Sequence, residues 1–296
     1  MRPRAALLAL LVTFLWSTSW VLIKLGLRAE LPALTFAGLR YSLAFLCLAP
    51  FVALSPARRR SLRALPRAAW AQLALLGLLF YSLTQGAQFV GLALLPAATV
   101  TLLLSFSPLV VALLSGLLTG EKPARGQWGG IALSAAGAAV YFFPLAAAGG
   151  QALGLAVALL GVLANAASAL LGRRVNRQAA LSPLLVTTVS MGIGGGLLLA
   201  VGVATQGFGR LGPEQWLFVL WLAVVNTAVA FTLWNHSLRT LTAVESSVIN
   251  NTMLPQIAVL AWLFLGEALG WRQIAGLILV AVGTLLVQLR GRRNRT

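Results

Sequence analysis

Acidic residues, cysteine and histidine are scarce in this sequence. Among its 296 residues, the five acidic side chains are all glutamates, and Cys47 and His236 are the only residues of their kinds. One cysteine excludes a disulfide within the chain, and the sequence offers no cluster of His, Cys and carboxylate ligands for a metal ion. No nucleophile is paired with a general base within the apolar segments either. We therefore expect a protein that is not an enzyme and that uses no metal or cofactor.

Charged residues of both signs are few, whereas apolar residues are abundant. Charged residues make up 9% of the chain and hydrophobic residues 59%, with a mean hydropathy of +0.92. A water-soluble domain needs a more polar exterior than this composition supplies. The 22 Lys and Arg residues suggest a nucleic-acid-binding protein at first, but they occupy short gaps between apolar runs. The composition predicts a polytopic membrane protein without a nucleic-acid partner.

Ten apolar runs have the length of a helix that crosses a bilayer, about 20 residues. They predict an all-α protein with spans at residues 5–24, 34–54, 70–91, 98–119, 127–145, 152–171, 182–203, 215–235, 244–265 and 271–289. With the N-terminus inside, 17 Lys and Arg residues fall in cytoplasmic segments, and only Lys24, Arg28, Arg210 and Arg272 fall in the opposite loops. The positive-inside rule then places both termini in the cytoplasm and the protein in the cytoplasmic (inner) membrane.

A polar stretch between spans occurs twice. The sequence "GEKPARGQWGG" at 120–130 returns as "GEALGWRQIAG" at 266–276, an offset of 146 residues. Pro108 and Pro255 precede the two stretches at similar distances, each in the middle of a predicted span. The chain is thus predicted to consist of two five-helix units, residues 1–146 and 147–296. Because five is odd, the second unit enters the membrane from the opposite side, and such inverted repeats are typical of secondary transporters.

These features resemble a known family along the whole chain. The "LWSTSW" of the first span, the prolines and the "GE…Q…G…G" junction are similar to those of the drug/metabolite transporter superfamily, specifically its EamA-type exporters. The resemblance implies a basket in which helices 1, 3, 4, 6, 8 and 9 enclose a central cavity, with helices 5 and 10 at the periphery. Some members of the superfamily export amino acids, including aromatic ones, and other branches carry nucleotide sugars or diverse metabolites.

Polar and aromatic side chains within the spans are the candidates for a transport path, because an unpaired polar group in lipid is expensive. Tyr81, Gln85 and Gln88 follow i, i+4, i+7 and share one face of the third span. The full set of substrate-binding candidates is Trp16, Ser17, Trp20, Arg40, Tyr81, Gln85, Gln88, Asn165, Ser168, Asn226, Trp234, Asn250 and Asn251, with predicted helix breaks at Pro108 and Pro255.

Each of these residues also has a structural interpretation. Asn, Gln and Ser side chains join membrane helices through hydrogen bonds, and tryptophans pack. Arg40 either extends toward the interface or holds a substrate carboxylate. A proline inside a helix frees the carbonyl four residues earlier, which leaves an acceptor for a ligand or a water molecule.

No acidic residue lies in the middle of a predicted span, so we expect alternating access that does not need a proton gradient. The mixture of amides, hydroxyls and indoles favours amphipathic metabolites, amino acids first, while a single buried cation disfavours nucleotide sugars. Nucleosides and sugars are alternative substrates. A membrane-embedded enzyme or a scaffold is the alternative from another class. The sequence leaves open the direction of transport and whether the protein is a monomer or a homodimer.

Overall fold

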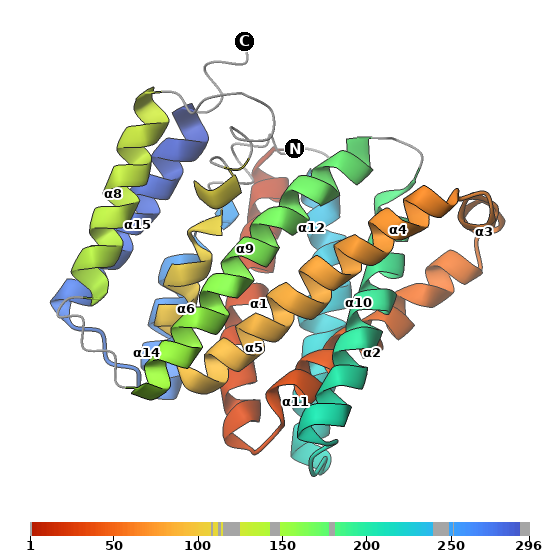
Figure 1. Cartoon of the computed structure of the whole chain (residues 1–296), viewed down its shortest axis with the longest axis horizontal. Helices are drawn as coiled ribbons and strands as arrows, with labels where there is room; N and C mark the ends of the chain where they lie inside the picture. Colours follow the sequence, from red (N-terminus) through yellow and green to blue (C-terminus); the bar gives the residue numbers. More distant parts are fainter. Residues whose placement is uncertain are drawn as a thin grey trace.

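The computed structural model is a helical bundle. It describes residues 2–107, 109–111, 114, 125–142, 149–177, 181–238, 249–250 and 252–290, and regular structure within these residues is entirely helical (Figure 1). Five helical stretches in this part of the chain are long and apolar enough to cross a membrane, and four shorter apolar helices accompany them. In lipid, a helix pairs its own backbone N–H and C=O groups by hydrogen bonds, and this explains why the apolar segments are helical. The predicted all-α polytopic membrane protein is confirmed.

The described elements agree closely with most of the predicted spans. In chain order they are α1 (Arg2–Arg28), α2 (Ala33–Ala53), α3 (Pro56–Arg63), α4 (Arg67–Leu76), η1 (Gly77–Thr84), α5 (Gln85–Leu94), α6 (Ala97–Leu104), α8 (Arg125–Phe142), α9 (Gly149–Arg177), α10 (Pro183–Gln206), α11 (Pro213–Ala223), η2 (Val224–Val229), α12 (Ala230–Leu238), α14 (Met253–Leu265) and α15 (Trp271–Arg290). Helix α3 was not predicted, because it is short and carries four arginines and therefore lacks the apolar signal of a span.

Prolines mark where helices begin. Pro32, Pro66 and Pro96 occupy N-cap positions, and Pro56, Pro183 and Pro213 are the first residues of their helices. The fixed φ of proline suits these positions, and the N–H group it lacks has no intrahelical partner there.

Pro255 was predicted to mark a helix break in the middle of a span, and the described residues place it close to the start of a helix. Helix α14 begins at Met253 after Thr252, so Pro255 lies in the first turn. A proline there removes no intrahelical hydrogen bond, because the first N–H groups of a helix have no such partner. The equivalent Pro108 lies outside the described residues.

Two wide π-helical segments interrupt otherwise regular helices. Segment η1 continues α4 into α5, and η2 continues α11 into α12. At each segment a threonine hydroxyl donates to the carbonyl oxygen five residues earlier, Thr84 to Leu79 and Thr227 to Leu222, both at 2.8 Å. Adding the repeat offset of 146 to η1 gives a range that covers η2. π-Helical turns are rare and frequently occur at functional sites.

Helices α8 and α15 form a close antiparallel pair at one edge of the bundle (Figure 1). A Cβ atom at Gly276 would lie 2.7 Å from the carbonyl oxygen of Gly137, and one at Gly283 would lie 2.6 Å from that of Gly130. Only glycine permits such a backbone approach. The pairing of these two helices away from the centre agrees with the peripheral position expected for helices 5 and 10.

Other contacts between helices also occur in matching pairs. Helix α1 packs against α14 and against η2 and α12, while α9 packs against α6 and against η1 and α5. Helices α2 and α10 pair antiparallel, with Gly38 against Leu199, Gly195 against Tyr41 and Gly202 against Thr35. The beginning of α1 and the end of α15 lie at the same end of the bundle (Figure 1).

Candidate functional site

An aromatic cluster joins α1 to α12. The ring of Trp16 lies 5.3 Å from that of Phe231 and 5.2 Å from that of Trp234, measured between centroids, and both pairs are tilted. All three side chains are only partly buried. Tilted contacts at this distance are favourable for aromatic rings. The structure thus brings together two predicted residues, Trp16 and Trp234, and adds Phe231, which stands three residues before Trp234 and was missed because Phe is common in any apolar span.

Asn226 lies on η2 with its side chain fully buried. Its Nδ2 donates to the carbonyl oxygen of Leu15 and, at 3.2 Å, to the hydroxyl of Thr18. Its Oδ1 has no hydrogen-bond partner among the described residues. A buried acceptor without a partner is costly, so this oxygen is suited to a donor from a ligand or a water molecule.

Arg40 on α2 is a buried cation, 4% exposed. Its Nε donates to the hydroxyl of Thr227 on η2 at 3.0 Å, and its guanidinium lies 5.2 Å from the centre of the Tyr41 ring. The only ion pair within the described chain joins Lys24 and Glu267, so no carboxylate there neutralises Arg40. A buried charge without a counter-ion within a membrane protein is a strong indication of a functional site.

A second group of polar side chains lies beside Arg40. The hydroxyl of Tyr41 donates to Oε1 of Gln85 at 2.6 Å, and the Tyr41 and Tyr81 rings are 5.4 Å apart in an edge-on arrangement. Gln88, one turn beyond Gln85, is also buried. The predicted face of the third span therefore points into the protein. Tyr41 on α2 thus links the polar residues of η1 and α5 to Arg40, which itself contacts Thr227 on η2.

Helices α1 and α14 are joined by a chain of hydrogen bonds. The hydroxyl of Ser17 lies 2.8 Å from Oε1 of Gln256 and 2.7 Å from the carbonyl oxygen of Thr13 in its own helix, and Nε2 of Gln256 donates to the hydroxyl of Thr252 at 3.0 Å. Ser17 was a predicted site residue, whereas Gln256 was not. The i, i+4 spacing of Thr252 and Gln256 was the available signal. Ser17 and Gln256 each have hydrogen-bond partners in the protein. This chain of contacts therefore fits a role in joining the two helices.

The remaining predicted residues are spread over the molecule. Trp20 is 6% exposed and lies in the main hydrophobic core with Phe36 and Phe89. The hydroxyl of Ser168 donates to the carbonyl oxygen of Asn165 within α9 at 2.8 Å. Asn250 is exposed, and Asn251, like Pro108, lies outside the described residues.

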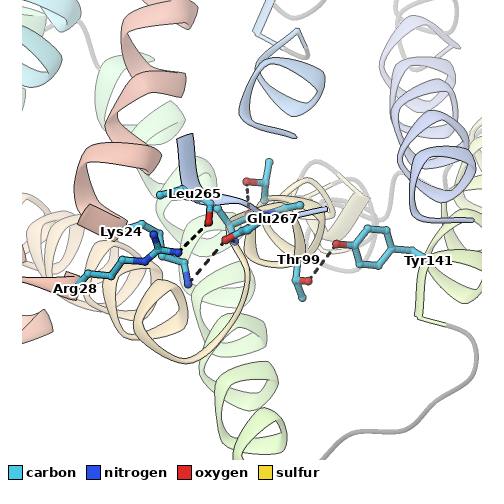
Figure 2. A network of polar contacts seen from close by, with 9 residues as sticks. Lys24, Arg28, Thr99, Tyr141, Leu265 and Glu267 are labelled. Carbon is cyan, nitrogen blue, oxygen red and sulfur yellow. Dashed lines mark hydrogen bonds and ion pairs between the residues drawn. The ribbon is translucent and has the colours of Figure 1, made fainter. Parts of the chain in front are cut away.

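One end of the bundle is held together by the glutamate of the second junction stretch (Figure 2). The carboxylate of Glu267 accepts hydrogen bonds from the backbone N–H groups of Ala97 at 2.9 Å and Ala98 at 3.4 Å, at the start of α6. Nζ of Lys24 on α1 lies 4.0 Å away, and Arg28 donates to the carbonyl oxygen of Leu265 at 3.0 Å. The ends of α1, α6 and α14 therefore meet here.

This network gives a physical reason for the repeated "GE". A carboxylate at the first N–H groups of a helix satisfies donors that have no intrahelical partner and interacts favourably with the helix dipole. Gly266 has φ +70°, a left-handed conformation that ends α14 and turns the chain toward Glu267. The equivalent Gly120 and Glu121 lie outside the described residues.

The described residues offer aromatic faces, amides, hydroxyls and one buried cation, and these groups can hydrogen-bond to a small molecule and stack on it. No group of three metal-ligating side chains occurs in this part of the chain. Polar groups of this kind between the helices of a polytopic membrane protein are typical of membrane transporters.

Comparison with known proteins identifies the family. The model of the EamA-like transporter family matches the chain twice, over residues 3–143 and 152–289. The chain therefore belongs to the EamA-like transporter family, and the predicted membership is confirmed. It is a multi-pass membrane transporter of small molecules, and its relatives are named as transporters rather than enzymes.

Three relatives have similar sequences over most of their length. The uncharacterized transporter YvbV of Bacillus subtilis is 28% identical over 99% of this chain and 94% of its own. A probable terminal-alkyne amino-acid exporter of Streptantibioticus cattleyicolor is 29% identical over 99% and 97%. The S-adenosylmethionine/S-adenosylhomocysteine transporter of Chlamydia trachomatis serovar L2 is 29% identical over 89% and 83%. A crystal structure with 21% identity superposes with a TM-score of 0.66 over 99% of this chain, which shows the fold alone.

Proposed function

We propose that the protein carries small amphipathic metabolites, amino acids first, across the cytoplasmic membrane by alternating access between two inverted five-helix repeats. The repeats are residues 1–146 and 147–296. The double match to one family model supports this division. The antiparallel pairs α2–α10 and α8–α15, and the matching packing of α1 and α9, support the inverted orientation.

The observation that carries the proposal is the buried Arg40, for which the described residues supply no carboxylate partner. An α-amino acid supplies the missing group, because its carboxylate forms paired hydrogen bonds with a guanidinium. Nε of Arg40 already donates to Thr227, which fixes the side chain and leaves its terminal NH₂ groups for a ligand. Asn226, the neighbour of Thr227, adds an acceptor that has no hydrogen-bond partner within the described part of the chain and suits an ammonium or amide donor.

The aromatic cluster of Trp16, Phe231 and Trp234 supplies the apolar part of the proposed site. It lies on α1 and α12, next to η2, which holds Asn226 and Thr227. A side chain of the substrate stacks on the partly exposed rings. Gln85, Gln88, Tyr81 and Ser17 remain proposed as lining residues, and Asn165, Ser168 and Asn250 as further contacts from the other helices.

Both termini are proposed to be cytoplasmic, from the distribution of Lys and Arg. This orientation places the Glu267 network at the external face. Because the network ties α1, α6 and α14 together, we infer that the external side is closed in this conformation and that opening it separates these three helix ends.

S-adenosylmethionine or S-adenosylhomocysteine is a second candidate substrate. The name of the chlamydial relative favours it. Both compounds carry the same α-amino acid group for Arg40, and an adenine ring stacks on indoles. A sulfonium is also attracted to an aromatic face, which distinguishes the two compounds.

The test combines Arg40 variants with substrates that lack the carboxylate. In liposomes without a pH gradient, the wild-type protein should exchange radiolabelled amino acids and bind amino-acid amides far more weakly. Arg40→Gln should lower carboxylate-substrate affinity by at least about 30-fold and leave amide affinity unchanged. Arg40→Lys should recover part of the affinity, because an ammonium keeps the charge but not the paired geometry.

The controls separate binding from folding. Arg210→Gln removes an exposed positive charge elsewhere and should leave both affinities at the wild-type value. The melting temperature of each variant in detergent reports whether it is folded. Equal losses of acid and amide binding in Arg40→Gln contradict the carboxylate role. Strict dependence of flux on a proton gradient contradicts the proposed mechanism.

A further inference from the structure

An apolar groove lies between α14 and α15 on the outside of the bundle. Its volume is about 440 Å³, and its walls are a stripe of α14 from Leu254 to Trp262 and a stripe of α15 from Ile274 to Val282. Leu269, in the connection between the two helices, closes one end. The floor is buried at Leu254, Ala258 and Leu277. The rim is open, with Trp262 and Ile278 more than half exposed.

The packing of α15 explains why the groove exists. Gly276 and Gly283 hold α15 against α8, so the opposite side of α15 stands away from α14. Ala258 and Ala281 face the space with methyl groups only. The lining is hydrocarbon apart from the indole of Trp262, so neither water nor a polar substrate is accommodated. Within a bilayer this space is filled by the surrounding hydrocarbon.

The closed end of the groove carries a cation at the level where lipid headgroups lie. Trp271, the first residue of α15, is 73% exposed and stands on the same helix face as Ile274 and Ile278. The guanidinium of Arg272 lies 5.5 Å from the centre of the Trp271 ring. Interfacial tryptophans and arginines occur at this depth. Arg272 has no ion pair within the described chain, since Glu267 is engaged with Lys24 and the start of α6.

We propose that this groove binds one anionic phospholipid, with an acyl chain between α14 and α15 and the headgroup phosphate at Arg272. The apolar walls of the groove favour an acyl chain. Arg272 and the N-terminal end of α15 favour a negatively charged headgroup. The site lies apart from the residues proposed to bind substrate, and the inference does not depend on the identity of that substrate.

The first experiment counts bound lipid by native mass spectrometry of the full chain, titrated with phosphatidylglycerol or phosphatidylcholine of equal chain length. Ala258→Trp fills the groove and should abolish the tightest binding event for both lipids. Ala132→Trp, on an exposed position of α8, is the matched control and should bind as the wild-type protein does. Arg272→Gln should weaken phosphatidylglycerol about fivefold and phosphatidylcholine by less, because the choline ammonium already offsets the charge of its phosphate. Arg210→Gln should change neither.

A fluorescence measurement tests the proposal even if the Ala258→Trp variant does not fold. Phospholipids brominated on the acyl chain quench nearby tryptophans, and the difference between wild type and Trp262→Phe isolates the Trp262 signal. We expect brominated phosphatidylglycerol to quench that signal at a lower mole fraction than brominated phosphatidylcholine. Unchanged lipid binding in a folded Ala258→Trp variant, equal quenching by both lipids, or a lipid-free dimer that Ala258→Trp separates would overturn the proposal.

Discussion

The hydroxyl of Ser134 on α8 lies 3.5 Å from the carbonyl oxygen of Val280 on α15, and the two residues are 146 positions apart. This separation equals the offset of the sequence repeat. Gly137 meets Gly276 on one side of this contact, and Gly130 meets Gly283 on the other, so the repeat offset maps one glycine pair onto the other. Ser134 and Val280 therefore lie at the centre of this contact, with one glycine pair on each side.

Substitution of the glycines in this contact should destabilise the protein equally from either helix. Gly137→Ala and Gly276→Ala each place a methyl group against the backbone of the other helix, and we expect each to lower the free energy of unfolding by about 1–3 kcal/mol. Thermal unfolding in detergent measures the effect. Gly129→Ala is the control, since a Cβ there meets nothing within 4 Å. It should be neutral or stabilise by up to about 1 kcal/mol, because alanine favours helix. Equal melting temperatures for all three variants contradict the close contact.

Glu267 should contribute to stability mainly through the start of α6 and little through Lys24. Glu267→Ala removes the acceptor of two backbone N–H groups, and we expect a loss of about 1–2 kcal/mol. Lys24→Met removes only a 4.0 Å ion pair and should cost less than about 1 kcal/mol. The comparison is made by thermal unfolding in detergent at constant ionic strength. A larger loss from Lys24→Met than from Glu267→Ala assigns the main role to the ion pair instead.

Ser17 and Gln256 should be coupled. Their hydrogen bond joins α1 to α14, and in membrane proteins such bonds contribute about 0.6 kcal/mol on average and up to about 1.7. We expect Ser17→Ala and Gln256→Leu to show a coupling free energy in that range in a double-mutant cycle of unfolding. Pairing Ser17→Ala with Thr205→Ala, whose hydroxyl is bonded within α10, should give additive effects. Additivity of the first pair contradicts the contact.

Two tryptophans one turn apart in α1 should behave differently. Trp16 is partly exposed in the aromatic cluster, so Trp16→Leu should raise the KM for an aromatic substrate about two- to tenfold with little change in melting temperature. Trp20 is 6% exposed in the core, so Trp20→Leu should lower the melting temperature without changing KM. Flux in liposomes and unfolding in detergent measure the two quantities. The same change in KM for both variants contradicts the binding role of the cluster.

The sequence by itself determined the class of the protein and most of its helices. Hydrophobic runs of bilayer length fold as helices wherever lipid surrounds them, so these helices could be predicted without knowing which other helices they contact. The repeat at an offset of 146 was also visible without a structure. So was the inward-pointing face of Tyr81, Gln85 and Gln88, because helical spacing is a local property.

Only the tertiary structure decided which polar residues meet. Arg40 on α2 and Thr227 on η2 are 187 positions apart, and nothing in the sequence pairs them. Trp16 and Trp20 were indistinguishable candidates until packing exposed one to the aromatic cluster and buried the other in the core. Glu267 was predicted to lie in a junction, but its bonds to the start of α6 depend on how α14 and α6 pack. Contacts between distant segments follow from the packing of whole helices, which a local pattern does not contain.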